Sequence, residues 1–206
     1  MPKRFVSPSP AGLALSAILV AASALPVLAQ SQPSRVRGTI DHLAGTDFVV
    51  KVGSGNVSIA LPEGARVASV ARASLADIKP GSYIGTAAMP SEGGLRALEV
   101  LVFPEAMRGT GEGHREWDLM PESTMTNATV ASTVGKVEGE TLDLTYKGGA
   151  QKVMVPPGTP IVTLAPATRA DLKPGARVVV NVSKDAEGRM TAASVTVGKD
   201  GVDPPM

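Results

Sequence analysis

The chain contains no cysteine among its 206 residues. Disulfides and thiolate metal sites are therefore excluded, and so is a lipid-anchored cysteine at a signal-cleavage site. Without covalent cross-links, the fold has to be held together by the packing of its apolar core. Any metal site would have to use other ligands, such as histidine nitrogen or methionine sulfur.

Aromatic residues are also scarce, at 3% of the chain, and the charge is nearly balanced, with 20 basic and 19 acidic side chains. Proteins that bind single-stranded nucleic acid usually combine a basic groove with stacking aromatic side chains. A near-neutral chain with few aromatics therefore predicts no nucleic-acid partner and no general attraction to an anionic membrane surface.

The N-terminus has the pattern of an export signal. Two basic residues precede a mostly small and apolar run over 11–24, and the tripeptide VLA follows where a signal peptidase cuts. We predict a signal peptide over 1–29, a mature chain that begins at Gln30, and a periplasmic or secreted location. The apolar run is shorter than the roughly 20 residues that span a bilayer, and Pro26 interrupts it. An uncleaved anchor is the alternative, and we expect no integral membrane span after signal removal.

One stretch of the sequence occurs twice. Residues 76–82 (ADIKPGS) return as residues 170–176 (ADLKPGA), at an offset of 94. Over 57–84 the same offset needs no gap, gives 9 identities in 28 positions and matches apolar positions in kind. A fixed offset with matching apolar spacing indicates two copies of one folding unit.

The repeated stretch has the composition of a structural turn. Its aspartate can accept hydrogen bonds from nearby backbone N–H groups and stabilise a short helical turn. Its proline ends such a turn, and its glycine can take the positive φ that a tight turn into a strand needs. A catalytic role for the aspartates is the less favoured alternative. These structural turn residues are Asp77, Pro80 and Gly81 in the first copy, and Asp171, Pro174 and Gly175 in the second.

Alternation of apolar and polar residues predicts five strands in each copy. In the first copy, 35–103, three strands precede an alanine-rich stretch at 69–78 that favours a short helix, and two strands follow it. The second copy, 129–198, repeats this order with its short helix at 166–172. This is the order of an OB-type barrel. We predict an all-β fold of two tandem five-stranded OB-like barrels, each with one short helix and its own five strands, joined by a packed linker. The remaining segments are a leader at 30–34, the linker at 104–128 and a tail at 199–206.

The same motifs resemble a known group of domains. A V-x-G-x-V-like first strand at 36–40, a P-x-G element and the D-[IL]-K-P-G turn are similar to a domain family of unknown function in bacterial exported proteins. The resemblance covers both copies and implies small β-barrels in tandem. Because its motifs are turns, it implies a fold and no catalytic residues.

The linker contains the only tryptophan, Trp117, together with a histidine and several methionines. A long segment with such side chains is expected to pack on the barrels. In one interpretation Trp117, Leu119 and Met120 are apolar anchors. In the other, nitrogen and thioether ligands hold a soft ion such as Cu(I), with Trp117 adjacent to it. The ligands would then be His114, Met107, Met120 and Met125. This set is faintly similar to that of periplasmic copper chaperones, although those barrels carry a Met-x-Met pair on their strands.

No phosphate-binding loop or nucleophile elbow is present in the sequence. Acidic pairs such as Asp118 with Glu122 leave a hydrolase as a distant alternative. We therefore expect an exported, soluble, non-enzymatic binding or scaffolding protein without a cofactor, whose partner is an unknown protein or small ligand. A periplasmic protein that binds Cu(I) is the alternative.

Overall fold

The computed structural model describes Met1 and residues 34–53, 55–136 and 139–204. The chain divides into the units Met1–Gln30 and Ser31–Met206, and all the strands lie in the second unit. Apart from Met1 and Ser34, the predicted signal peptide and leader lie outside the described residues. Within the described residues, no helix has the length and apolar character needed to cross a membrane.

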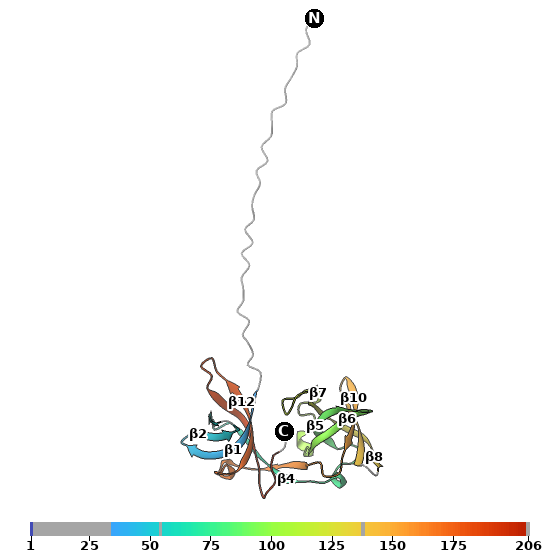
Figure 1. The fold of residues 1–206 in the computed structure, drawn as a ribbon. Coiled ribbons are helices and arrows are strands. Elements are labelled where there is room, and N and C mark those ends of the chain that lie inside the picture. Colours follow the sequence, from blue (N-terminus) through green and yellow to red (C-terminus); the bar gives the residue numbers. More distant parts are fainter. Residues whose placement is uncertain (2–33, 54, 137–138, 205–206) are drawn as a thin grey trace. The chain divides into compact units, whose positions relative to one another are not determined.

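The described residues form an all-β structure, with strands joined by turns and three short 3₁₀ helices (Figure 1). The strands are β1 Ser34–Ala44, β2 Asp47–Val52, β3 Gly55–Ala60, β4 Arg66–Arg72, β5 Tyr83–Ser91, β6 Gly94–Val102, β7 Gly113–Glu116, β8 Thr124–Lys136, β9 Gly139–Tyr146, β10 Gly149–Val155, β11 Ile161–Pro166, β12 Arg177–Lys184 and β13 Met190–Val197. The 3₁₀ helices are η1 Leu75–Asp77, η2 Glu105–Met107 and η3 Arg169–Asp171.

Strand pairing forms two closed rings. The first ring runs β1-β2-β3-β13-β12 and returns to β1, and a short parallel contact between β3 and β13 closes it. The second ring runs β8-β9-β10-β6-β5 and returns to β8, closed in the same way by a parallel contact between β6 and β10. Alternate residues point inward in each ring, and each ring has a separate apolar core, around Phe48 in the first and Leu142 in the second.

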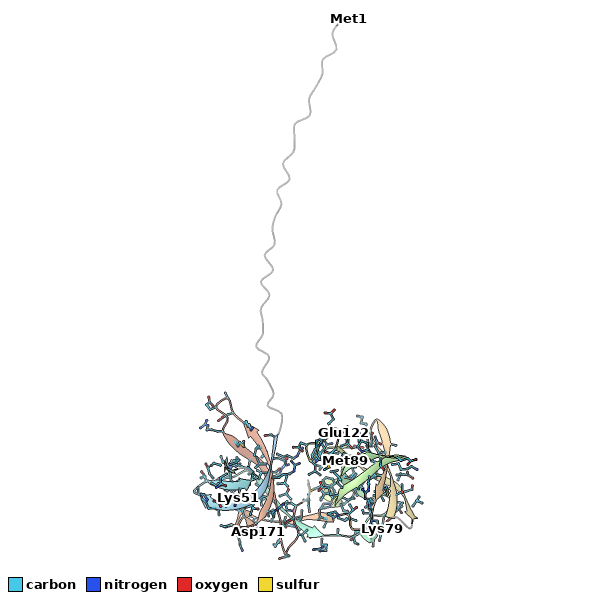
Figure 2. All side chains as sticks on the ribbon, viewed as in Figure 1. Met1, Lys51, Lys79, Met89, Glu122 and Asp171 are labelled. Carbon is cyan, nitrogen blue, oxygen red and sulfur yellow. The ribbon has the colours of Figure 1, made fainter. Side chains whose placement is uncertain are left out.

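The two sequence copies exchange strands between these rings. The first ring takes β1–β3 from the first copy and β12–β13 from the second, whereas the second ring takes β8–β10 from the second copy and β5–β6 from the first. Figure 2 shows the result: Lys51 of β2 and Asp171 of η3, from different copies, lie with the first ring, whereas Lys79 of the first copy lies with the other ring. The expectation that each copy holds its own five strands is therefore wrong.

An extra pair of strands, β4 and β11, links the rings: β4 also pairs with β13, and β11 also pairs with β6. The two strands meet at Val70 and Leu164, which are 94 residues apart and so are equivalent positions. The flanking pairs Ser69–Ala165 and Ala71–Thr163 also exchange equivalent positions. This self-complementary pairing is what a two-fold symmetric contact between identical units produces. We call β4 and β11 the bridging pair.

The predicted helices at 69–78 and 166–172 are much shorter in the structure, because part of each segment belongs to the bridging pair. Residues 69–72 belong to β4, and only Leu75–Asp77 are helical, as η1. In the second copy the helical part is reduced to η3, Arg169–Asp171. Alanine favours helix, but this preference is small and is overridden where backbone groups find strand partners on both sides.

The repeated turn lies where the chain passes from one ring to the other. The side chains of Asp77 and Asp171 each accept a 2.8 Å hydrogen bond from the backbone N–H three residues earlier. Gly81 and Gly175 have φ of 91° and 86°. Their N–H groups donate to the carbonyls of Val130 (2.8 Å) and Ile40 (2.7 Å), each on the first strand of the opposite copy. The turn therefore fastens the exchanged strands at their start.

Candidate functional site

The predicted linker is a hairpin rather than an irregular segment. Strand β7 pairs with the beginning of β8, and a turn over 117–123 connects them. Buried Ser123 organises this turn: its hydroxyl accepts a 3.1 Å hydrogen bond from the Met120 N–H and lies within donating distance of the Trp117 and Met120 carbonyls. The Trp117 N–H donates to the Ser123 carbonyl at 2.8 Å. The hairpin therefore holds Trp117 and Asp118 in a defined position.

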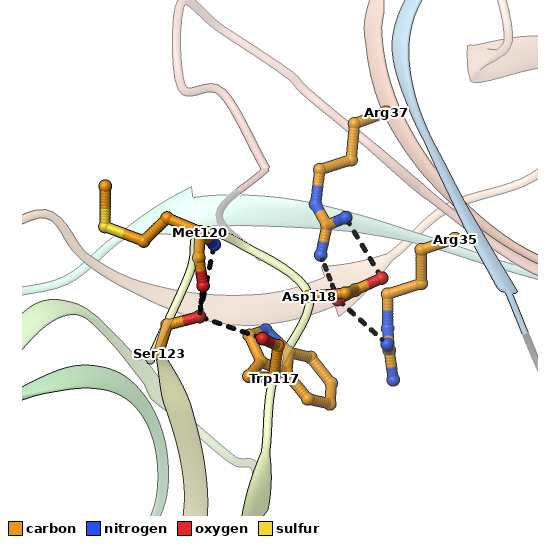
Figure 3. Close-up of polar contacts among 6 residues, drawn as sticks. All are labelled: Arg35, Arg37, Trp117, Asp118, Met120 and Ser123. Atoms are coloured by element: carbon orange, nitrogen blue, oxygen red, sulfur yellow. Dashed lines mark hydrogen bonds and ion pairs between the residues drawn. The ribbon is translucent and has the colours of Figure 1, made fainter.

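The hairpin is attached to β1 of the first ring through charged side chains (Figure 3). Arg35 and Arg37, which share one face of β1, both reach Asp118: Arg35 Nη1 and Arg37 Nη2 lie 3.1 Å and 2.9 Å from Asp118 Oδ1. The guanidinium carbon of Arg35 also lies 3.6 Å from the centre of a Trp117 ring, a cation–π geometry. Arg115 of β7 is 5.2 Å from the same indole.

A cavity of about 240 Å³ lies between this hairpin and the bridging pair. Its apolar lining includes the central residues of the bridging pair, Val70 and Leu164, with Leu101 and Phe103. Its polar lining includes Arg35, Arg115 and Asn127, and Trp117 borders it as well. Two guanidinium groups line the cavity, and none of its described lining residues carries a carboxylate.

Asn127 is a buried polar group beside this cavity, with only 6% of its surface exposed. Its Nδ2 donates to the Thr110 carbonyl at 3.0 Å, and its Oδ1 has no hydrogen-bond partner among the described residues. The amide fits because its strand neighbour is Gly85, where a Cβ atom would lie 2.7 Å from Oδ1. Burying an amide oxygen without a partner is unfavourable, so this position is not optimised for stability alone.

The cavity lining breaks the symmetry of the two copies. Arg35 pairs with Asn181, and Met125 pairs with Ala87. Asn181 and Ala87 are 94 residues apart, so Arg35 and Met125 occupy equivalent places. By the same register, Arg37 of the first copy corresponds to Asn127 of the second. The fold accepts an apolar or neutral residue at these places. The first copy has arginine at both, and Arg35 lines the cavity whereas Arg37 does not.

The structure does not bring the proposed metal ligands together. His114 pairs with Thr126 and Arg115 with Met125, so alternation puts the side chains of His114 and Met125 on opposite faces of the hairpin. Nδ1 of His114 lies 2.8 Å from the hydroxyl of Thr126, and Met125 is buried. Met107 and Met120 are exposed by 36% and 45%. No group of three or more His, Cys, Asp or Glu side chains suited to a metal occurs in the described part of the chain. The Cu(I) hypothesis stays a prediction.

Of the proposed anchors, Trp117 and Leu119 are half-buried and Met120 is exposed. Sequence reasoning missed Arg35, Arg115 and Asn127. Arginine on an alternating strand is typical of a solvated face, and the contact between Arg35 and Trp117 joins residues that lie far apart in the sequence. The single tryptophan was the one available signal, and Trp117 borders the cavity.

No protein-family model, curated protein or solved structure matches the chain in our comparisons. The similarity of the repeats to exported barrel domains of unknown function therefore remains a prediction from the turn motifs.

Proposed function

We propose that this protein is an exported, soluble, non-enzymatic binding protein whose ligand site is the cavity between the hairpin and the bridging pair. Export rests on the signal-like pattern over 1–29. The observation that carries the binding role is the cavity itself, where two guanidinium groups and a buried, incompletely hydrogen-bonded Asn127 adjoin an apolar floor. A few convergent polar groups in a mostly apolar hollow are typical of small-molecule sites.

We further propose that both rings are OB-like barrels that exchange their last two strands. The strand order β1-β2-β3-β13-β12 supports this, because an OB barrel is a five-stranded Greek-key barrel of three meander strands followed by two more. The exchange would explain why a binding cavity forms between the barrels, on the bridging pair, instead of on either barrel alone.

Ligand-dependent melting of the mature protein tests the binding role. A panel of neutral, anionic and cationic small molecules should contain members that raise the melting temperature. A ligand present at about 100 times its Kd stabilises the folded state by about 2.7 kcal/mol, which corresponds to a shift of roughly 5–10 °C for a chain of this size.

Val179, a buried residue of the cavity lining, provides the decisive variant. Val179→Phe fills part of the cavity and should abolish the response to every active compound. Val134→Phe introduces the same side chain at an exposed position on β8 and should leave the response intact. A panel without any active compound, or an unchanged response of Val179→Phe, would contradict the proposed site.

A further inference from the structure

We propose that the cavity binds a small organic anion, with an oxyanion head such as a carboxylate and a compact apolar body. This proposal rests on the proposed function and adds the chemical class of the ligand. The head would lie against Arg35 and Arg115, and the body would lie on the floor formed by Val70, Leu101 and Leu164.

Arg35 and Arg115 each use only one nitrogen of the guanidinium group in hydrogen bonds to described residues. Among the described residues, Arg35 bonds through Nη1 to Asp118, and Arg115 bonds through Nη1 to the Gly111 carbonyl at 2.8 Å. The other N–H groups of both guanidinium groups have no partner in that part of the chain. A guanidinium fork matches the two oxygens of a carboxylate, so a bound carboxylate would satisfy donors that the protein itself leaves free.

The local charge also favours an anion. Asp118 is shared by Arg35 and Arg37, and Arg115 has no ion-pair partner among the described residues. Two guanidinium groups therefore share one carboxylate, and that carboxylate does not line the cavity, whereas Arg35 and Arg115 do. An anionic head would reduce this positive excess, whereas a cationic head would be repelled by it.

The size and floor of the cavity define the rest of the ligand. A cavity of about 240 Å³ is smaller than most drug-sized pockets, which begin near 300 Å³, so a nucleotide or a long lipid would not fit. Its apolar floor would gain from covering hydrocarbon and not from covering a second charged group. The ligand class is therefore a small acid with a flat or branched hydrocarbon body.

The test uses the mature protein with three probes: benzoate, benzyl alcohol and inorganic phosphate. Benzyl alcohol keeps the ring without the charge, and phosphate keeps the charge without the ring. Binding is followed by the fluorescence of Trp117, the only tryptophan of the chain, and by titration calorimetry. We expect benzoate to bind at a single site, about tenfold or more tighter than either other probe, because a charge-assisted hydrogen bond contributes that much.

Matched arginine variants locate the site. Arg115→Gln should weaken benzoate by about tenfold or more without changing benzyl alcohol, and Arg35→Gln should do the same if the first variant folds poorly. Arg96→Gln removes an exposed guanidinium from β6, away from the cavity lining, and should change neither.

Each other outcome overturns a defined part of the proposal. Equal affinity for benzoate and benzyl alcohol overturns the anionic head, and equal affinity for phosphate overturns the apolar body. Benzoate binding that survives both arginine variants overturns the location. If benzoate fails while a neutral or cationic compound from the melting panel binds, the anion proposal is wrong and the proposed function stands. If no compound binds in either experiment, both are wrong.

Discussion

Asp118 is the residue through which the hairpin is attached to the first ring. Burial by itself would raise the pKa of its carboxyl group, but the hydrogen bond from Arg37 and the positive charges of Arg35 and Arg37 outweigh that effect. The pKa of Asp118 therefore lies below its ordinary value. A carboxyl group with a lowered folded pKa stabilises the folded state when ionised, and this contribution is lost as the pH falls through the folded pKa.

Asp118→Asn should lower the free energy of unfolding at about pH 7 by about 1 kcal/mol or less, because the aspartate is partly exposed and screened. The difference from the wild type should shrink as the pH falls below about 4, the ordinary pKa of an unfolded aspartate. Urea unfolding at about pH 7 and about pH 3 measures both values. Glu63→Gln, at an exposed position outside this cluster, should change stability little at either pH. An equal loss at both pH values would mean that Asp118 acts by packing and not by charge.

At the residue scale, sequence reasoning selected the segment around Trp117, which borders the cavity, but not the two arginines that line the cavity with it. Histidine and methionine near one tryptophan suggested a soft-metal site as the alternative to apolar anchoring, because spacing alone does not reveal which face of a strand each side chain occupies. The pairing of His114 with Thr126 decides that question, and it depends on β7 being a strand. Arg35 could not be selected, since its partner Asp118 is 83 residues away.

At the scale of single elements, the repeated turn provides a symmetric test. A Cβ atom on Gly81 or Gly175 would meet no neighbouring atom within 4 Å, so any penalty for alanine comes from the left-handed backbone alone. Gly81→Ala and Gly175→Ala should each destabilise the protein by about 1–2 kcal/mol. Gly64→Ala, at an open position without a left-handed φ, should be neutral or slightly stabilising. Thermal unfolding of the three variants provides the comparison, and an unaffected Gly81→Ala would show that the turn relaxes.

The strands that alternate clearly were predictable, whereas the bridging pair was not. Val178, Val180 and Val182 are all buried in the first ring, and this regular pattern gave β12 directly. In contrast, β4 reads RVASVAR, whose alanines favour helix, and it becomes a strand because β13 and β11 supply hydrogen-bond partners on both sides. Those partners belong to the other copy, so the deciding interaction is absent from the local sequence.

At the scale of the whole folded unit, the exchange could not be read from the sequence for a physical reason. The strand contacts inside a ring are nearly the same whether its last two strands come from the same copy or from the other one. Only the hinge segments, near β4 with η1 and β11 with η3, distinguish the two arrangements. Exchange of equivalent strands between the copies therefore changes little in the apolar pattern or in the strand order of each ring. Because both copies belong to one chain, each is present at high local concentration near the other, which favours the exchange.

The absence of cysteine makes the exchange directly testable. Thr39 of the first copy and Arg177 of the second are paired residues on β1 and β12. Paired antiparallel residues have Cα atoms about 4.5–5.5 Å apart, which is within the range for a disulfide. The double variant Thr39→Cys with Arg177→Cys should therefore form an intramolecular disulfide on oxidation. Closing so long a loop should produce faster migration on a non-reducing gel and a higher melting temperature.

The matched control uses the pairing that an unexchanged barrel would have. Tyr83 is the first-copy equivalent of Arg177, and it pairs with Thr129 in the second ring. Thr39→Cys with Tyr83→Cys would therefore cross-link only if each copy kept its own strands. After circular dichroism has shown that both double variants are folded, we expect a monomeric cross-link in the first and none in the second. A cross-link in the control alone would mean that each copy forms its own barrel. A disulfide-linked dimer of the first variant would mean that strands are exchanged between molecules, because Thr39 would then meet Arg177 of another chain.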